Sequence, residues 1–244
     1  MMKRNVITGA LTALCLSLAG CGTTGTNETQ IPEETPAPEV QEETAVAEPA
    51  APAETEAPAQ SDEGETAAGS DALVVYFSRT GEQYTVGVID HGNTAIVAEM
   101  ITEKTGADLF EIIPEEDHYP MTYAELTEVA KKEQNDNARP AYAGEAPDLS
   151  GYGTIFIGSP VWWGDWPMIM YTFFEENADA LAGKNLVPFS THEGSGLSGF
   201  DRKLASACPD STVLDGLAIR GNDAQNKQKE VRETVNDWLS GLGY

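Results

Sequence analysis

Residues 73–94 read LVVYFSRTGEQYTVGVIDHGNT, and this stretch decides the fold. Its apolar start, residues 73–77, is rich in β-branched and aromatic side chains and is typical of a fully buried strand. The next segment, AIVAEMITEKTGA, has apolar residues at helical spacing, so Asn93 or Thr94 is the expected N-cap of a helix. Hydroxyl groups and backbone N–H groups at a helix N-terminus can bind phosphate without a metal. The stretch therefore predicts a phosphate cradle.

Residues 1–20 have the pattern of a secretory signal peptide. Lys3 and Arg4 precede an apolar run that is too short for a permanent membrane-spanning helix, and small residues follow it. The segment ends in Leu-Ala-Gly-Cys, which is similar to a bacterial lipobox, so Cys21 is expected to be lipidated. The alternative is an ordinary signal peptide with a chance cysteine. We expect an extracytoplasmic protein that is anchored to the cell membrane through Cys21.

Residues 21–71 are expected to form a disordered acidic tether. Residues 22–71 contain 13 acidic side chains and no lysine or arginine, and are rich in Pro and Ala. Such a segment has too little apolar surface to offset its ordering entropy. The folded domain, residues 72–244, carries 27 acidic and 12 basic side chains, a net charge near −15. This charge argues against nucleic acid as a partner and for membrane contact through the lipid anchor only.

Strands and helices are expected to alternate along the domain. After the first pair, the patterns predict strands at residues 107–113, 154–158, 185–190 and 212–219, and helices at residues 123–134, 168–177, 200–207 and 224–242. Pro188 suits an edge strand or a bulge better than the centre of a ladder. The alternation predicts an α/β fold with a parallel sheet between two helix layers. Ligand sites of such sheets lie at the carboxyl ends of the strands.

Three loops at that edge form the candidate site: residues 78–94, 159–167 and 191–199. The first offers hydroxyl groups for phosphate. The second places two adjacent tryptophans at a strand end, where one can stack on a planar ring for about 0.5–1.5 kcal/mol. The third is rich in glycine, so its backbone can approach a ring edge. The candidate binding residues are Ser78, Arg79, Thr80, Asn93, Thr94, Pro160, Val161, Trp162, Trp163, Gly164, Thr191, His192, Gly194, Ser195 and Gly196. Together they describe a site for a mononucleotide with a flat ring.

From residue 73 to residue 242 the domain resembles the flavodoxin-like family. The matching pieces are YFSRTG with a delayed GNT at 92–94, TGADLFEI at 105–112, RPAY at 139–142, IFIGSPVWWGDWP at 155–167, VPFSTHEGSG at 187–196 and VLDGLAI at 213–219. The resemblance implies a three-layer sandwich with a five-stranded parallel sheet in the order 2-1-3-4-5, and FMN bound non-covalently. The first loop would then hold the phosphate, Trp162 would stack on the isoalloxazine, and residues 191–196 would line its other edge.

Two features depart from the pattern of the family. In most flavodoxins S-x-T-G-N-T is continuous, whereas residues 82–92 intervene here. This insertion either folds outward and restores the cradle, or presents Tyr84, Asp90 or His91 over the site. The third loop also lacks the tyrosine that commonly covers the outer ring face. His192 is the nearest aromatic residue, so a more exposed flavin edge is expected.

The resemblance implies an electron carrier that serves a redox partner protein or a small-molecule acceptor and has no catalytic residue of its own. The expected lipid anchor would tether this carrier to the membrane. One alternative is an FMN-dependent oxidoreductase that transfers electrons from NAD(P)H to quinones or other small acceptors. Another is a flavin-free binding module on the same fold.

Other motifs carry less weight. The G-x-G-x-x-G at residues 194–199 follows the fourth strand rather than the first, so it does not indicate an NAD site. The absence of a G-x-S-x-G motif argues against a hydrolase. Three scattered histidines do not predict a metal site, and Cys208 is expected to be a partly buried side chain.

Overall fold

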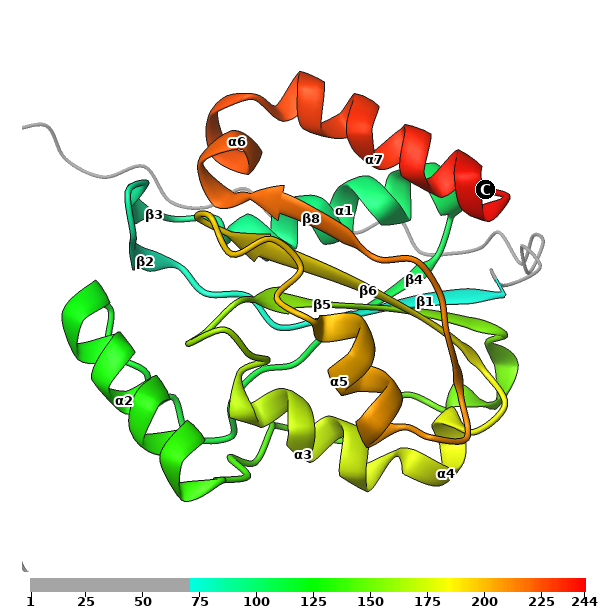
Figure 1. Ribbon diagram of the computed structural model, residues 1–244, viewed down its shortest axis with the longest axis horizontal. Coiled ribbons are helices and arrows are strands. Elements are labelled where there is room, and N and C mark those ends of the chain that lie inside the picture. The colour runs from blue at the N-terminus through cyan, green and yellow to red at the C-terminus, as the bar shows by residue number, and fades with distance from the viewer. Residues whose placement is uncertain (1–70) are drawn as a thin grey trace, which may run out of the picture. The chain divides into compact units, whose positions relative to one another are not determined.

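The computed structural model describes residues 71–244, so the predictions made for residues 1–70, including the signal peptide, Cys21 and most of the tether, lie outside the described residues. A parallel sheet lies between two layers of helices (Figure 1). The predicted three-layer α/β fold is therefore confirmed. Within residues 71–244, the helices are too short or too polar to cross a membrane.

The main sheet contains six strands, and the helices alternate with them along the chain. The strands are β1 (Ala72–Tyr76), β4 (Asp108–Glu111), β5 (Thr154–Pro160), β6 (Asn185–His192), β7 (Thr212–Val213) and β8 (Leu217–Arg220). A separate antiparallel hairpin consists of β2 (Gly81–Gln83) and β3 (Gly87–Ile89). The helices are α1 (Asn93–Thr105), α2 (Tyr123–Asp136), α3 (Met168–Glu176), α4 (Ala178–Leu181), α5 (Phe200–Ala207), α6 (Gly221–Asn226) and α7 (Gln228–Leu242), with a 3-10 turn η1 at Leu149–Gly151.

The strands lie in the order β4-β1-β5-β6-β7, with β8 also beside β6, and all pairs in this sheet are parallel. If β7 and β8 are counted as one interrupted strand, this is the predicted order 2-1-3-4-5. The expectation of a continuous fifth strand is wrong, because residues 214–216 leave the sheet beside Pro188. Proline offers no N–H to a neighbouring strand. Gly216 also approaches it closely, since an added Cβ would lie 2.6 Å from the Pro188 carbonyl oxygen.

Both faces of the sheet are buried, because alternate side chains of a strand point to opposite sides. Leu73, Val75 and Phe77 pack in one core beneath α2–α5, whereas Val74 and Phe156 pack in the other core with α1 and α7. Figure 1 shows α1, α6 and α7 on one side of the sheet and α3–α5 on the other. The two cores fix the strand ends from which the site loops leave.

Cys208 lies in the core beneath α5, where it is more deeply buried than expected. The residue is 3% exposed and its thiol is free. Burial raises the pKa of the Cys208 thiol to about 11, because a thiolate is unfavourable away from water. The thiol is therefore protonated at neutral pH.

Helix α1 starts one residue earlier than expected. Its N-cap is Gly92, not Asn93 or Thr94, and this cap has no side-chain hydrogen bond of its own. The missing acceptor comes from the first loop, because Ser78 Oγ accepts a hydrogen bond from the backbone N–H of Ala95 at 3.1 Å. A serine distant in sequence therefore caps the helix.

Candidate functional site

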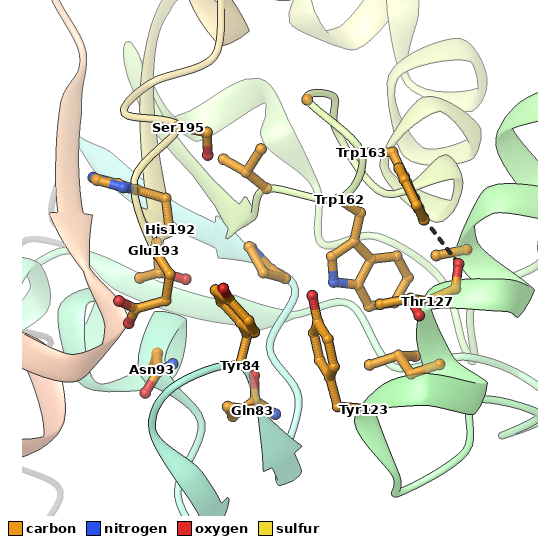
Figure 2. Close-up of a pocket in the computed structure, with 16 residues that line it drawn as sticks. Gln83, Tyr84, Asn93, Tyr123, Thr127, Trp162, Trp163, His192, Glu193 and Ser195 are labelled. Atoms are coloured by element: carbon orange, nitrogen blue, oxygen red, sulfur yellow. Dashed lines mark hydrogen bonds between the residues drawn. The ribbon is translucent and has the colours of Figure 1, made fainter. Parts of the chain in front are cut away.

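A cavity of about 540 Å³ opens at the carboxyl ends of β5 and β6, beside the start of α1 (Figure 2). This volume is within the range of small-molecule and cofactor sites, about 300–1,000 Å³. The wall combines predicted and unpredicted residues: Gln83, Tyr84, Asn93, Tyr123, Leu126, Thr127, Ala130, Pro160, Val161, Trp162, Trp163, Gly164, Thr191, His192, Glu193 and Ser195. The three predicted loops thus meet at one cavity.

Ser78 and Gly92 meet at the N-terminus of α1, although the insertion separates them in sequence. An added Cβ at Gly92 would lie 2.1 Å from Ser78 Oγ and 3.0 Å from the carbonyl oxygen of Arg79. A glycine is required at this close approach. The insertion therefore leaves the Ser78–Gly92 contact and returns to it without disrupting it. Ser78 Oγ already accepts a hydrogen bond from the backbone N–H of Ala95 in the first turn of α1, and neither Ser78 nor Gly92 lines the cavity. A helix N-terminus of this kind can bind an anion.

Arg79 is one of the candidate binding residues of the first loop, but its guanidinium lies against a different loop. It forms an ion pair with Asp117 at 2.8 Å and donates a hydrogen bond to the carbonyl oxygen of Tyr119 at 2.6 Å. Its Cζ also lies 5.5 Å from the centre of the Tyr119 ring. The structure therefore uses Arg79 to hold the 117–121 loop, and the residue does not line the cavity.

The two threonines of the predicted cradle also lie off the cavity wall. Thr94 is buried, and its Oγ1 lies 2.8 Å from Oγ1 of Thr191, which ties α1 to the end of β6. Thr80 is exposed at the start of the hairpin. Asn93 does line the cavity, where its Oδ1 accepts a hydrogen bond from Gln225 at 2.8 Å.

The second loop makes a tight turn between Trp162 and Asp165. The two residues exchange backbone hydrogen bonds of 2.9 Å in both directions. The turn residues Trp163 and Gly164 have φ values of 50° and 74°, the left-handed conformation of a type I′ turn. Lys203 donates to the carbonyl oxygen of Gly164, which holds the turn in place. The turn fixes where the two tryptophans can lie.

The two tryptophan side chains point in different directions, as expected. Trp162 packs edge-on against Phe77 at 5.4 Å and Tyr119 at 5.2 Å, and lines the cavity. Trp163 is 54% exposed, and its indole N–H donates to the carbonyl oxygen of Thr127 on α2 at 2.9 Å. Figure 2 shows both rings on the same wall. Trp162 is therefore packed more closely by its neighbours than Trp163.

His192 is the last residue of β6. Burial lowers the pKa of its imidazole. Its Nδ1 accepts a hydrogen bond from the backbone N–H of Gly194 at 2.9 Å, which assigns the proton of the neutral ring to Nε2. Ser195 also lines the cavity. The predicted Gly194 and Gly196 shape this loop through positive φ values of 132° and 62° without lining the cavity themselves.

A model of the flavodoxin family matches residues 72–238. The chain belongs to the flavodoxin family. A search of curated proteins found no significant match.

Solved flavodoxin-like structures agree with this assignment. A candidate flavoprotein from Bacteroides uniformis is 28% identical, with a TM-score of 0.54 over 70% of this chain and 99% of that chain. One from Bacteroides eggerthii is 29% identical, with a TM-score of 0.55 over 72% and 99%. A flavoprotein from Lactobacillus acidophilus, solved in complex with FMN, is 21% identical, with a TM-score of 0.50 over 66% and 98%. The last likeness shows the fold alone.

Compared with the expected flavodoxin site, the structure adds a wall from α2. Tyr123, Leu126, Thr127 and Ala130 line the cavity. Their spacing of i, i+3, i+4 and i+7 places them on one face of the helix. This spacing was the sequence signal that could have shown that the four residues act together. Sequence reasoning predicted the helix but not that this face borders the site.

Glu193 is a second addition to the flavodoxin site. Its carboxylate accepts a hydrogen bond from the backbone N–H of Asn222 at 2.6 Å and pairs with Arg220 at 3.2 Å. The side chain is 12% exposed. It therefore joins the third loop to the start of α6 and adds a negative charge to the wall.

Proposed function

We propose that this flavodoxin-family protein binds FMN in the cavity and transfers electrons through it. The observation that supports this most directly is that Asn93, the first residue of α1 and the neighbour of the Ser78–Gly92 contact, lines the same cavity as Trp162. The FMN complex of the Lactobacillus acidophilus flavoprotein supports the same cofactor. FMN would supply one- or two-electron chemistry, and the protein would bind and orient it.

The residues of the cavity fit the chemical parts of FMN. Asn93 on the cavity wall, together with Ser78 and the first turn of α1 beside it, would hold the phosphate, because hydroxyl, amide and helix N–H groups all donate hydrogen bonds to an anion. Trp162 would stack on the isoalloxazine, and His192 would offer its Nε2–H at an edge. The net charge near −15 opposes further negative charge on the ring, so we expect a low potential for the second electron.

FMN binding is tested by titrating the purified full-length chain with FMN and with riboflavin. We expect saturable binding of FMN, with the visible flavin bands shifted from those of free FMN and weaker binding of riboflavin. A chain that folds but takes up no FMN would instead indicate the flavin-free binding module. This titration separates the proposed cofactor site from an empty flavodoxin fold.

The oxidoreductase alternative is favoured by exposed aromatic side chains on the cavity wall. Trp163 and Tyr84 are 54% and 55% exposed, so a planar acceptor can reach them. FMN-loaded protein that oxidises NAD(P)H with a quinone, and without another protein, would establish this activity. A carrier would require a separate redox partner protein for the same reaction.

We also propose that the protein is an extracytoplasmic lipoprotein, held at the membrane through Cys21 by the acidic tether. The support is the sequence pattern of residues 1–71. The wild-type protein is expected to incorporate labelled fatty acid, and Cys21→Ser is expected to abolish this labelling, because no thiol is left to carry the lipid. A wild-type protein that takes up no label would overturn lipid anchoring.

A further inference from the structure

The insertion forms the β2–β3 hairpin, and its turn places Tyr84 on the cavity wall. Tyr84 follows β2 directly and is 55% exposed, although it lines the cavity. The other two candidates of the insertion lie elsewhere, because His91 pairs with Glu99 at 3.1 Å and Asp90 is exposed off the wall. Tyr84 is thus the aromatic side chain that the insertion contributes to the site.

The hairpin is held in this position by α2 and by Met121, two residues before the helix. The backbone N–H of Glu82 donates to the carbonyl oxygen of Met121 at 2.8 Å. The carboxylate of Glu82 accepts a hydrogen bond from the backbone N–H of Tyr123 at 2.8 Å, at the positive N-terminal end of α2. Two contacts from one residue therefore fix both the backbone and the direction of the hairpin.

The ring of Tyr84 is held in place as well as its backbone. It stacks on Tyr123 with ring centres 5.4 Å apart and ring planes 28° apart, and Figure 2 shows the two rings side by side. One face of Tyr84 is thereby occupied. Its remaining exposure leaves aromatic surface free on the cavity side, which is suited to a second planar ring.

We infer that Tyr84 is a ring-binding residue of the flavin site. This inference rests on the proposed function, because it assigns Tyr84 to the isoalloxazine of FMN. Tyr123 acts through Tyr84 by fixing its ring, and Glu82 acts by fixing the hairpin. The insertion therefore contributes to the cofactor site.

Tyr84→Leu in the full-length chain tests the assignment, because leucine keeps bulk but removes the aromatic face. We expect the Kd to rise about 3- to 10-fold for both FMN and riboflavin, since stacking involves the ring that the two share. The fluorescence of bound flavin should also increase, because a stacked tyrosine quenches it. Binding is followed by calorimetry so that affinity and fluorescence are independent measurements.

Two control variants make the result specific. Tyr84→Phe keeps the aromatic face and is expected to restore wild-type affinity and quenching. Val88→Ala lies on the same hairpin, at a residue that is 78% exposed and off the cavity wall, and is expected to change neither. Thermal unfolding of each variant verifies that it is folded.

Two different results would overturn the assignment. If wild-type protein binds FMN but Tyr84→Leu has unchanged affinity and fluorescence, Tyr84 does not contact the ring and the proposed function stands. If the folded wild-type protein binds neither FMN nor riboflavin, the proposed function fails together with this inference.

Discussion

Gly92→Ala is expected to raise the Kd for FMN about 10- to 100-fold while changing the Kd for riboflavin by less than about 3-fold. The new methyl group would lie 2.1 Å from Ser78 Oγ and 3.0 Å from the Arg79 carbonyl oxygen, so the cradle has to open. Ser78 would then lose its hydrogen bond to Ala95 N. Hydrogen bonds to a charged group contribute about 1.5–3 kcal/mol each, and riboflavin has no phosphate to lose. Parallel titrations with the two ligands measure the difference.

Gly151→Ala is the matched control for this change. Gly151 has open space around the position of an added Cβ and lies in η1, before β5 begins and away from the cavity. It is expected to leave the affinity for both ligands unchanged. Equal losses for FMN and riboflavin in Gly92→Ala would contradict a phosphate cradle at this glycine.

Phe77→Ala is expected to destabilise the domain by about 3–5 kcal/mol, which lowers the Tm by about 6–20 °C. Phe77 is fully buried directly after β1, and its ring packs edge-on against Trp162 and Tyr119, with ring centres 5.4 Å and 5.9 Å apart. Removing it leaves a cavity beneath the tryptophan wall. We therefore also expect a several-fold weaker affinity for FMN, measured at a temperature where the variant is folded.

Phe156→Ala separates the effect on stability from the effect on the site. Phe156 is equally buried but packs on the opposite face of the sheet, against Trp238 and Tyr244. A similar loss of Tm is expected, with unchanged affinity for FMN. If both variants weaken FMN binding equally, the support of Trp162 by Phe77 is not specific.

The sheet and the three site loops could be predicted because each depends on a local pattern. The apolar run of residues 154–158 indicated a buried strand, and it became most of β5. Two adjacent tryptophans after this strand could not both enter the core. The structure places Trp162 and Trp163 on the cavity wall.

The parts that could not be predicted depend on contacts between distant residues. Arg79 was among the candidate binding residues of the first loop, but its partner Asp117 lies on a loop whose position no local pattern reveals. The wall from α2 similarly depends on where the helix packs. Contacts such as Trp163 with Thr127, and His118 with Glu133 at 2.7 Å, hold the helix there.

The split of the fifth strand shows how a single residue can alter a correct pattern. Residues 212–219 have a strand-like sequence, yet they form the two short strands β7 and β8. Pro188 was recognised as a poor fit to the centre of a ladder, but it interrupts the neighbouring strand rather than its own. Because Pro188 has no N–H to donate, the hydrogen bond is missing in the neighbouring strand. A pattern read along one strand does not describe this effect on its neighbour.

The buried Cys208 makes the domain a convenient host for site-specific labels. Its thiol is shielded from solvent and protonated at neutral pH, so alkylating reagents react with it slowly. A cysteine introduced at the exposed Val88 would therefore carry a dye or spin label selectively within residues 71–244. The hairpin could then be followed by fluorescence or paramagnetic resonance without removing a native side chain from the core.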